Sequence, residues 1–401
     1  MNILFLSSWF PYPPNNGSRI RIYNLIKQLS KKHNITLLSF TQDDFEEGNI
    51  EPLKQYCKKI KIVKGRWFNN KSMKGILGYF TFTPRSLVET YTPEMRAEFE
   101  KETGDYDLII CSGFPTVLYA LKNNKIPKIF EEIEVSVIKD SIKKEGFRKK
   151  LTWWKLRCFI EKVLSKYDGY TVVSGGEMEE ISGISTHAEG EVIPNGIDIL
   201  DCKYSFNPDA VNLIYPGALT YGANFDAMDH FLRNIYPLIQ KEIPDVRLKI
   251  TGSIKGVDTS SLKLDKNVDM TGYVDDVKSL VSNSAVCIVP LRIGGGTRVK
   301  ILESMALGTP VVATSKGAEG IDGLMRVAGT TEPQSAGYQF NIWVEDDPEK
   351  FAKAVAALVK NRKLAEQMAI NARKLVVEKY DWNTIGDKFE MFIKKISAKK
   401  Y

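Results

Sequence analysis

The sequence predicts an α/β protein made of two halves, each with a mostly parallel sheet, which face each other across a cleft. Three observations support this prediction. The chain has 401 residues, which suits two domains of about 150–200 residues each. Short apolar runs alternate with stretches of helical spacing, as expected for parallel strands joined by helices. The alternation is interrupted at the turn-rich stretch VIPNGID (192–198) and then starts again.

In the first half, the short apolar runs predict buried parallel strands. NILFLSS (2–8) leads into a loop with three prolines, and RIRIYNLIKQLSKK (19–32) has the spacing of a helix. NITLLSF (34–40) then completes a strand–helix–strand unit. Later strands of the same sheet are expected at YDLIICS (106–112), PKIFEE (127–132) and YDGYTVVS (167–174).

The second half repeats this pattern. Strands are expected at VNLIYPG (211–217), VRLKITG (246–252), AVCIVPL (285–291) and PVVATS (310–315), and helices at 224–242, 274–284, 297–307 and through most of 348–396. The acid pairs Asp275–Asp276 and Asp346–Asp347 precede helices. We interpret them as helix caps rather than as metal ligands.

Composition indicates a soluble globular protein, with 43% hydrophobic residues, 26% charged residues and a net charge of +7. The five cysteines are scattered and only three histidines are present, which favours reduced thiols over a disulfide framework or a zinc site. The first residues do not form a signal peptide, and no run reaches the ~20 apolar residues of a membrane span. We therefore expect a cytoplasmic protein.

The stretch GGGTRVKILESMALGTPVVAT (294–314) is the most informative motif. Its glycines, Gly294, Gly295 and Gly296, fall between an expected strand and the start of an expected helix. Unpaired N–H groups and the positive end of the helix dipole favour anions there. With Arg298 and Lys300 added, the motif suits a phosphate or a diphosphate.

Glu303 lies further along the same helix, roughly 9 Å from its amino end at 1.5 Å per residue. This offset suits the ribose of a nucleotide whose diphosphate lies at the helix start, because a carboxylate accepts hydrogen bonds from ribose hydroxyls. The competing interpretation is an exposed Lys300–Glu303 ion pair beside a plain loop. The motif matches neither the P-loop pattern nor the dinucleotide-binding pattern.

The same stretch resembles the donor-site signature of retaining glycosyltransferase family 4 (group 1), which has the GT-B architecture of two facing Rossmann-like domains with a donor cleft between them. The likeness extends over nearly the whole chain. Similar segments are WFPYPPNNGSRIRIYNLIKQLS, YTVVSGGE, VIPNGID, YPGALTYGANFDAM, IWVEDDPEKFAKAVAALV and NARKLVVEKYDW.

The resemblance implies sugar transfer from a nucleotide-diphosphate sugar of the UDP, GDP or ADP type, with retained anomeric configuration and without a metal or cofactor. By position, Glu303 corresponds to the family's ribose-binding carboxylate. Family members often carry a second Glu eight positions earlier, where this chain has Gly295. They also often carry an Arg and a Lys early in the second domain, which this chain lacks. Arg298 and Lys300 are therefore expected to hold the diphosphate and stabilise its departure.

Other expected donor contacts are Gly17 in the first loop, Gly217 at the opening of the second domain, and Thr297 beside the glycines. For Gly17, a simple turn before the helix is the competing interpretation. No catalytic base is obvious. Glu132 and Glu134 are the candidates for contact with the acceptor or the donor sugar, against the alternative of solvated acids at a strand end.

Residues 52–88 contain nine Lys or Arg and no Asp or Glu. The candidate membrane or acceptor patch comprises Lys58, Lys59, Lys61, Lys64, Arg66, Trp67, Phe68, Lys71 and Lys74. A second stretch, KKEGFRKKLTWWKLR (143–157), again combines cations with tryptophans. Such a combination suits an anionic membrane surface. The alternatives are a solvated cationic face with tryptophans in the core, or an anionic soluble acceptor; nucleic acid is not expected.

We therefore expect an acceptor domain at 1–193, a nucleotide-sugar donor domain at 194–379, and a helix at 380–401 that returns to the first domain. The expected activity is that of a retaining glycosyltransferase acting on a glycan, lipid-linked or small-molecule acceptor, including a cell-surface glycan precursor, in the cytoplasm or on the inner face of the membrane. The alternatives are a nucleotide-sugar epimerase and a non-catalytic nucleotide-sugar-binding relative.

Overall fold

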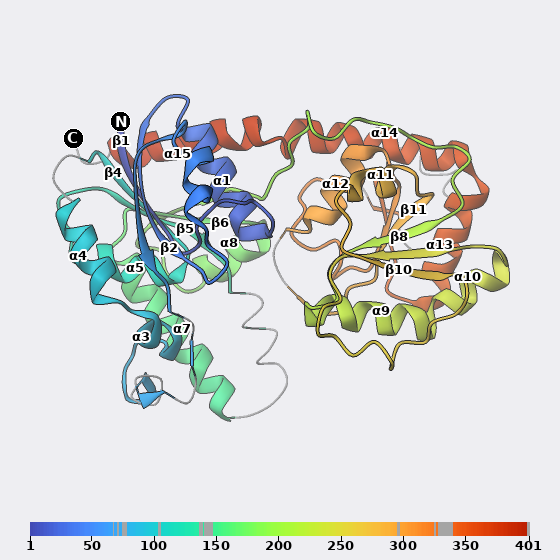
Figure 1. The fold of residues 1–401 in the computed structure, drawn as a ribbon, viewed down its shortest axis with the longest axis horizontal. Helices are drawn as coiled ribbons and strands as arrows, with labels where there is room; N and C mark the ends of the chain where they lie inside the picture. The colour runs from blue at the N-terminus through green and yellow to red at the C-terminus, as the bar shows by residue number, and fades with distance from the viewer. Residues whose placement is uncertain are drawn as a thin grey trace. The chain divides into compact units, whose positions relative to one another are not determined.

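The protein, seen here as a computed structural model, forms two compact units. Met1–Asn195 together with Trp382–Tyr401 make unit 1, and Gly196–Asp381 make unit 2. The structure describes residues 1–66, 68–69, 72–73, 78–102, 106–135, 139, 147–294, 297–324, 326–327 and 340–398. Each unit contains a parallel sheet with helices (Figure 1).

Unit 1 has a sheet in the order β3-β2-β1-β4-β5-β6-β7, in which every neighbouring pair is parallel. Its elements are β1 Asn2–Ser7, α1 Gly17–Leu29, β2 Asn34–Thr41, η1 Glu47–Leu53, β3 Cys57–Lys64, η2 Gly78–Phe80, α3 Arg85–Thr90, α4 Pro93–Lys101, β4 Leu108–Ser112, α5 Phe114–Ala120, β5 Lys128–Ile133, α7 Phe147–Leu164, β6 Gly169–Val172, α8 Gly175–Ser182, β7 Glu189–Val192 and α15 Trp382–Ala398.

Alternation along the strands of unit 1 gives the sheet two apolar faces. Ile3 and Phe5 of β1 pack in one cluster with α1 and α15, whereas Leu4 and Leu6 belong to a second cluster with α4, α5 and α7. Because successive side chains of a strand point to opposite faces, one apolar run supplies both clusters. The sheet therefore lies between two helical layers.

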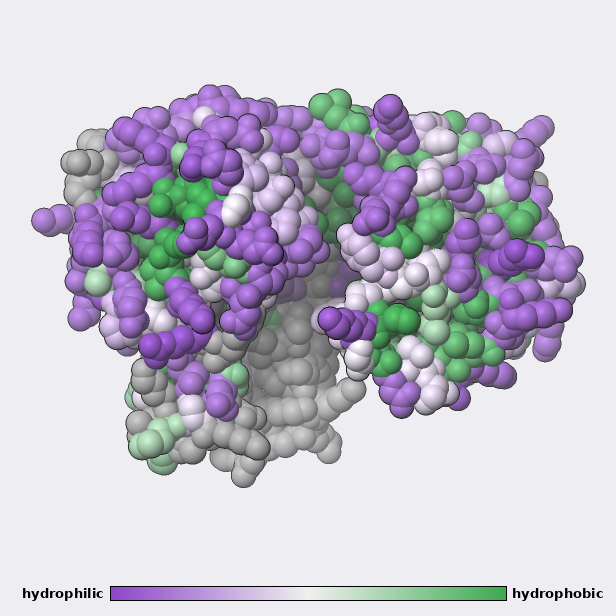
Figure 2. All heavy atoms as spheres, viewed as in Figure 1, coloured by the Kyte–Doolittle hydropathy of each residue, from purple (hydrophilic) through white to green (hydrophobic). Residues whose placement is uncertain are grey.

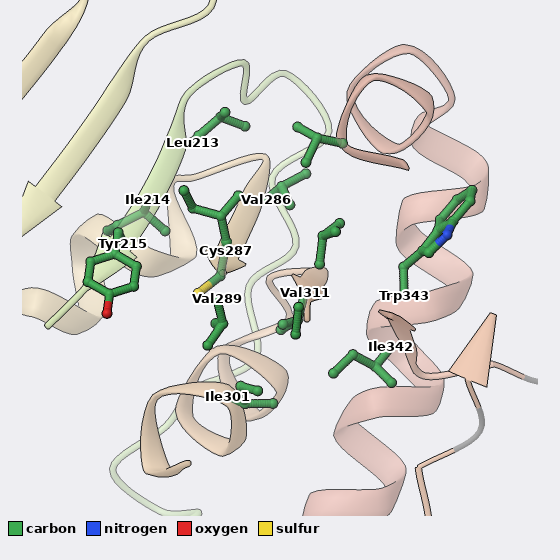
Figure 3. Close-up of a cluster of buried hydrophobic side chains, with 14 of the residues drawn as sticks. Leu213, Ile214, Tyr215, Val286, Cys287, Val289, Ile301, Val311, Ile342 and Trp343 are labelled. Atoms are coloured by element: carbon green, nitrogen blue, oxygen red, sulfur yellow. The ribbon is translucent and has the colours of Figure 1, made fainter. Parts of the chain in front are cut away.

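Unit 2 has the order β10-β9-β8-β11-β12-β14-β13, again with parallel neighbours; it matches unit 1 except that the last two strands are exchanged. Its elements are β8 Leu213–Pro216, α9 Gly222–Asn234, α10 Tyr236–Glu242, β9 Leu248–Thr251, β10 Val268–Gly272, α11 Val277–Ser282, β11 Val286–Val289, α12 Val299–Leu307, β12 Val311–Ala313, β13 Arg326–Val327, β14 Ile342–Val344, α13 Pro348–Lys360 and α14 Arg362–Lys379. Branched side chains of its central strands pack against Ile301 of α12 (Figure 3).

The structure corrects the sequence prediction in two places. The helix expected at 224–242 is two helices, α9 and α10. Ile235 is the C-cap of α9 and the N-cap of α10, and Pro237 occupies the first turn of α10. Proline has no N–H group to continue a helical hydrogen-bond ladder, but it fits a first turn. The strands β3, β7, β10, β13 and β14 were not expected, because they are short or lack a continuous apolar run.

Helix α15 is joined to unit 1 by packing that can be tested. Phe389 is fully buried in the cluster that α15 shares with α1, whereas Met391 on the same helix is 73% exposed. Phe389→Ala should lower the free energy of unfolding by about 3–5 kcal/mol. Met391→Ala should change it by less than about 0.5 kcal/mol. Urea unfolding followed by tryptophan fluorescence measures both, and equal effects of the two variants would contradict this packing.

Candidate active site

The candidate donor site in unit 2 lies where the order of the sheet reverses. β8 and β11 are neighbours at the centre of the sheet, and the connections from them run to opposite sides. Ligands of open α/β sheets bind outside the carboxyl ends of the strands at this point. Here β8 ends at Pro216, followed by Gly217, and the segment after β11 leads to Arg298 and α12.

Lys300 reaches from the first turn of α12 to the end of β8. Its Nζ donates to Asn224 Oδ1 at 3.1 Å and lies 4.1 Å from the centroid of the Tyr215 ring. Tyr215 OH donates to the same Asn224 oxygen at 2.7 Å, and Asn224 Nδ2 donates to Ala218 O at 2.8 Å. The ammonium is thus held by neutral groups, and it forms no ion pair with an acid among the residues that the structure describes.

Burial and, to a smaller extent, the nearby charge of Arg298 together lower the pKa of Lys300 to about 7. Gly217 lies close to this ammonium, since a Cβ at Gly217 would stand 2.5 Å from Lys300 Nζ. The absence of a side chain at Gly217 therefore leaves the space that the ammonium occupies. A cation in such surroundings gains from an anionic ligand, which restores its charged form.

The remaining donor candidates surround the start of α12. Arg298 is 8% exposed, and its Nη2 lies 3.5 Å from Lys316 O. Gly294 has φ +110°, and a Cβ there would stand 3.4 Å from Arg298 Nη2. Thr297 is buried. Gly295 and Gly296 lie outside the described residues, so the expected anion contacts of their N–H groups stay predictions.

Glu303 lies one turn after Lys300 and is half-buried. Burial raises the pKa of its carboxyl group, and the charge of Lys278 opposes this shift. The competing Lys300–Glu303 ion pair is not formed: Lys300 turns instead to Asn224. Within the described residues the Glu303 carboxylate makes neither a hydrogen bond nor an ion pair, so its oxygens remain available to a ligand.

One acid of each predicted pair caps a helix, and Asp346 accepts from Ser315 N instead. Asp276 Oδ1 accepts from Ser279 N at the start of α11, and Asp347 Oδ1 accepts from Glu349 N and Lys350 N at the start of α13. Across the residues that the structure describes, no cluster of three His, Cys, Asp or Glu side chains has the arrangement of a metal site.

Unit 1 contains a cavity of about 390 Å³ at the equivalent reversal of its own sheet. We call it the polar cavity. Ser8 and Trp9, directly after β1, and Gly113, directly after β4, line it together with Glu132 and Glu134. Gly113 has φ +79°, and a Cβ there would stand 2.4 Å from Ser8 Oγ. Only glycine fits this turn, which brings the chain after β4 against the chain after β1.

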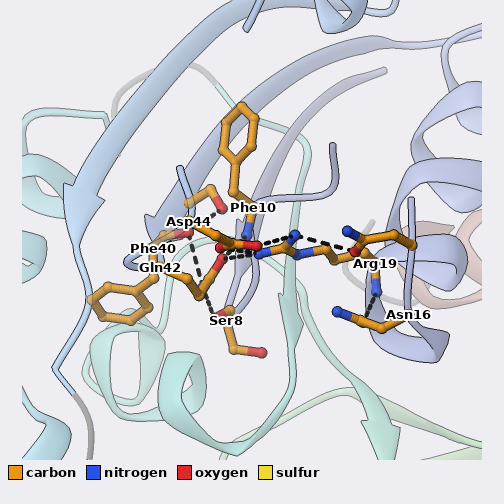
Figure 4. Close-up of polar contacts among 9 residues, drawn as sticks. Ser8, Phe10, Asn16, Arg19, Phe40, Gln42 and Asp44 are labelled. Atoms are coloured by element: carbon orange, nitrogen blue, oxygen red, sulfur yellow. Dashed lines mark hydrogen bonds and ion pairs between the residues drawn. The ribbon is translucent and has the colours of Figure 1, made fainter. Parts of the chain in front are cut away.

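Gln42 holds one wall of the polar cavity in place (Figure 4). Its Nε2 donates to Ser8 O at 3.2 Å, and its Oε1 accepts from Phe10 N at 3.1 Å. Arg19 of α1 lies beside it and donates to both carboxylate oxygens of Asp44, at 2.8 and 2.6 Å. These bonds lock the loop after β1 to the loop after β2.

Glu131 is held by a fully buried ion pair beneath the cavity. Arg21 Nε donates to Glu131 Oε1 at 2.6 Å, and both side chains are inaccessible to solvent. Ser112 Oγ donates to the other Glu131 oxygen at 2.6 Å. Arg21 Nη1 also donates to Pro194 O and Asn195 Oδ1, each at 3.1 Å. Glu131 thus has a structural role within β5.

Glu132 is presented to the cavity by an unusual backbone conformation. It has φ +62°, the one described non-glycine residue with positive φ, and its N–H donates to Thr171 Oγ1 at 3.0 Å. Burial and the charges of Glu131 and Glu134 raise its pKa to about 8, while Arg21, 3.9 Å away, opposes the shift. A strained residue that is held in place and lines a cavity points to function.

The candidate patch lies mainly on the edge strand β3, and several of its cations are paired. Lys59 contacts Glu102 at 2.5 Å, Lys61 lies 4.0 Å from Glu98, and Arg66 lies 3.9 Å from Glu94. Lys58 and Lys64 are also on exposed positions of β3, where lysines protect an edge strand from pairing. Phe68 is 44% exposed; Trp67, Lys71 and Lys74 lie outside the described residues.

Two further residue predictions concern Gly17 in the first loop and the paired tryptophans of the second basic stretch. Gly17 is the first residue of α1, and a Cβ there would meet nothing within 4 Å. Trp153 packs against the core of unit 1, whereas Trp154 is 50% exposed. Of the helices that the structure describes, none has the length and apolar character needed to cross a membrane.

Sequence reasoning missed Arg21, Gln42, Tyr215 and Asn224. Arg21 carried one usable signal: it shares the buried face of α1 with Leu25, and a cation on a core face needs a buried partner. The other three residues lie in ordinary strand, loop and helix contexts. Only the tertiary structure brings them to the ends of β2 and β8.

The buried ion pair can be tested through stability. Arg21→Met leaves Glu131 charged and buried without its partner, which should lower the free energy of unfolding by about 3–5 kcal/mol. The double variant Arg21→Met/Glu131→Gln should regain at least half of this loss, because no buried charge remains and Ser112 keeps an acceptor. Urea unfolding monitored by circular dichroism measures both. A double variant no more stable than the single one would contradict the assignment.

Comparisons with known proteins agree with this architecture. Residues 210–361, within unit 2, match the family model described as Glycosyl transferases group 1. An uncharacterized 44.6 kDa protein in the cps region of Klebsiella pneumoniae is 23% identical over 401 residues, covering 94% of this chain and 96% of that protein.

Two solved structures show the same fold along their whole length. HepE of Anabaena, in complex with UDP and glucose, has a TM-score of 0.66 at 15% identity and covers 98% of this chain and 99% of its own. Sucrose-phosphate synthase of Thermosynechococcus elongatus has a TM-score of 0.70 at 16% identity and covers 99% and 100%. The chain thus has the GT-B fold, and the match of unit 2 to a group 1 glycosyltransferase domain classes it as a glycosyltransferase.

Proposed function

We propose that this glycosyltransferase binds the diphosphate of a nucleotide sugar at Arg298 and Lys300 in unit 2 and an acceptor in the polar cavity of unit 1. One observation carries the proposal. An ammonium that pairs with no acid in the described part of the chain, with its pKa lowered to about 7, lies beside a glycine at the reversal point of a parallel sheet. A diphosphate supplies the counter-charge that these neighbours do not.

The chemistry of the proposed reaction follows from these positions. Breaking the bond between sugar and diphosphate builds negative charge on the leaving group. Arg298 and Lys300 stabilise that charge, an effect commonly worth about 2.7–4 kcal/mol for each donor removed. Glu303 accepts hydrogen bonds from the ribose, and Gly17, Gly217, Thr297 and the 294–296 glycines remain the expected donor contacts. Glu132 and Glu134 contact a reacting sugar.

A uridine nucleotide is the first donor to test, because the Anabaena HepE structure is a complex with UDP and glucose. Retention of configuration follows from the resemblance to family 4 and is tested by the anomeric proton signals of the product. The epimerase alternative predicts interconversion of the donor sugar without an acceptor. A transferase gives slow hydrolysis at most. A lipid-linked or cell-surface glycan precursor is the acceptor class we propose, handled at the inner face of a membrane.

The ribose contact can be tested by a pair of ligands. Glu303→Ala should weaken UDP binding about 10- to 100-fold, since a hydrogen bond to a charged group contributes about 1.5–3 kcal/mol. The wild type should prefer UDP over 2′-deoxy-UDP, and the variant should have lost most of that preference. Calorimetry measures all four affinities. If the variant discriminates as well as the wild type, Glu303 does not contact the ribose.

The diphosphate contact can be tested by measuring the uptake of protons when UDP binds. At pH 8 Lys300 is mostly neutral, because its pKa is about 7. A bound diphosphate favours the charged form and raises this pKa, so binding UDP at pH 8 should take up close to one proton. Calorimetry in buffers of different ionisation enthalpy measures the uptake.

The matched control is Lys300→Arg, which stays charged throughout and should bind UDP with almost no uptake. Equal proton uptake by the variant and the wild type would show that the diphosphate lies away from Lys300.

A further inference from the structure

A second cavity in unit 1, of about 350 Å³, has a mainly apolar lining. We call it the apolar cavity. Leu87 of α3, Phe114 of α5, and Leu151 and Leu156 of α7 line it. Soluble proteins normally fill such space with their own side chains, since apolar surface packed against apolar surface stabilises the fold. An unfilled apolar cavity of this size suits the hydrocarbon part of a ligand.

The two cavities of unit 1 are neighbours. Phe68 and Phe114 line both of them, so the same two rings separate the polar cavity from the apolar one. The polar cavity offers Ser8, Gln42 and Glu132, which are groups that recognise hydroxyls. A ligand that filled both spaces would therefore be polar at one end and apolar at the other.

Cations surround the boundary between the two spaces. Arg66 lines the polar cavity, and Arg85 and Lys155 line the apolar one. The Arg85 guanidinium lies 5.7 Å from the centroid of the Phe68 ring, which places it at the shared wall. No acid is among the residues that line the apolar cavity in the described part of the chain. This charge distribution is complementary to an anionic group between the two ends of the ligand.

The apolar character continues on the outside of the same elements. Phe80 is 86% exposed and Phe82 is 71% exposed. The ring centroid of Phe82 lies 6.2 Å from that of Trp154, which is half exposed. Figure 2 shows pale green, apolar atoms at the lower end of unit 1, below the position labelled α3 in Figure 1. Exposed rings beside cations are typical of proteins that contact the headgroup level of a membrane.

We infer that the apolar cavity binds the hydrocarbon chain of the acceptor, that Arg66, Arg85 and Lys155 contact a phosphate-type linker, and that the acceptor sugar lies in the polar cavity. This inference rests on the proposed function and names its acceptor class: a sugar joined through phosphate to a lipid. The exposed rings of Phe80, Phe82 and Trp154 contact the membrane from which the acceptor is taken.

The test uses the full chain and alkyl phosphates below their micelle concentration. Decyl phosphate should bind at least 30-fold more tightly than ethyl phosphate, because each buried CH₂ group strengthens binding roughly threefold to fourfold until the cavity is full. Decyl phosphate should also bind at least tenfold more tightly than uncharged decyl glucoside. Wild-type binding of decyl phosphate no tighter than that of ethyl phosphate would overturn the inference.

Variants locate the binding. Leu151→Trp fills the apolar cavity and should weaken decyl phosphate at least tenfold, whereas the matched control Leu200→Trp changes an exposed leucine of unit 2 and should have no effect. The double variant Arg85→Gln/Lys155→Gln should lose the preference for decyl phosphate over decyl glucoside. UDP binding in the same samples reports folding and the donor site. If the wild type does not bind UDP, the result counts against the proposed function. If it binds UDP but not decyl phosphate, the result counts against this inference alone.

Vesicles separate a lipid acceptor from simple membrane attachment. Co-sedimentation uses vesicles of phosphatidylcholine with and without phosphatidylglycerol. Both the wild type and the Leu151→Trp variant should attach to the vesicles through their exposed rings. Added decyl phosphate should not reduce the attached fraction of either protein. If vesicles capture both proteins equally and neither binds decyl phosphate, the face is a membrane contact only and the assigned cavity is wrong.

Discussion

The direction of parallel strands is the constraint on which both sites of this protein depend. In each sheet the strands run the same way, so their carboxyl ends share one edge. The order reverses between β1 and β4 in unit 1 and between β8 and β11 in unit 2, where helices leave to opposite faces. The chain after β1 and β4 lines the polar cavity, and the chain after β8 meets Lys300 from α12. Both sites therefore arise where the connections after neighbouring strands diverge, and side chains then line the space that is left.

Many of the side chains that line the two sites are neutral, so the sequence alone does not mark them as site residues. The strand–helix alternation and the Gly-Gly-Gly-Thr-Arg motif predicted two Rossmann-like units and the start of α12, because periodicity and glycine placement are local properties. They could not predict that Lys300 turns to Asn224 rather than to Glu303, since a helix i, i+3 pair and a contact 76 residues away look alike in one sequence. The split of α9 from α10 was readable, because Pro237 lies in the interior of the expected helix.

The basic segment shows a different limit of sequence reasoning. Nine cations without an acid suggested a continuous charged patch, but α4 and its C-cap residue bring three acids against it: Glu94 lies near Arg66, Glu98 near Lys61 and Glu102 near Lys59. The uncompensated positive charge of β3 is therefore smaller than its composition implies, and the lysines also protect an edge strand. The stronger observation lies further along the chain, where exposed rings adjoin an apolar cavity. Segment composition identified the region, whereas the fold identified which part of it is suited to a ligand.

Burial shifts the pKa values of Lys300 and Glu132 in opposite directions. It lowers the pKa of Lys300 to about 7 and raises the pKa of Glu132 to about 8. Near neutral pH, Glu132 is thus mainly protonated and Lys300 is only partly charged, while Arg298 supplies a permanent positive charge beside Lys300. A protonated Glu132 can donate a hydrogen bond to a sugar oxygen, which a carboxylate cannot do. If a diphosphate binds here as proposed, it favours the charged form of Lys300. Its binding then adds the charge of Lys300 to the permanent charge of Arg298, and a neutral sugar without a diphosphate has no such effect.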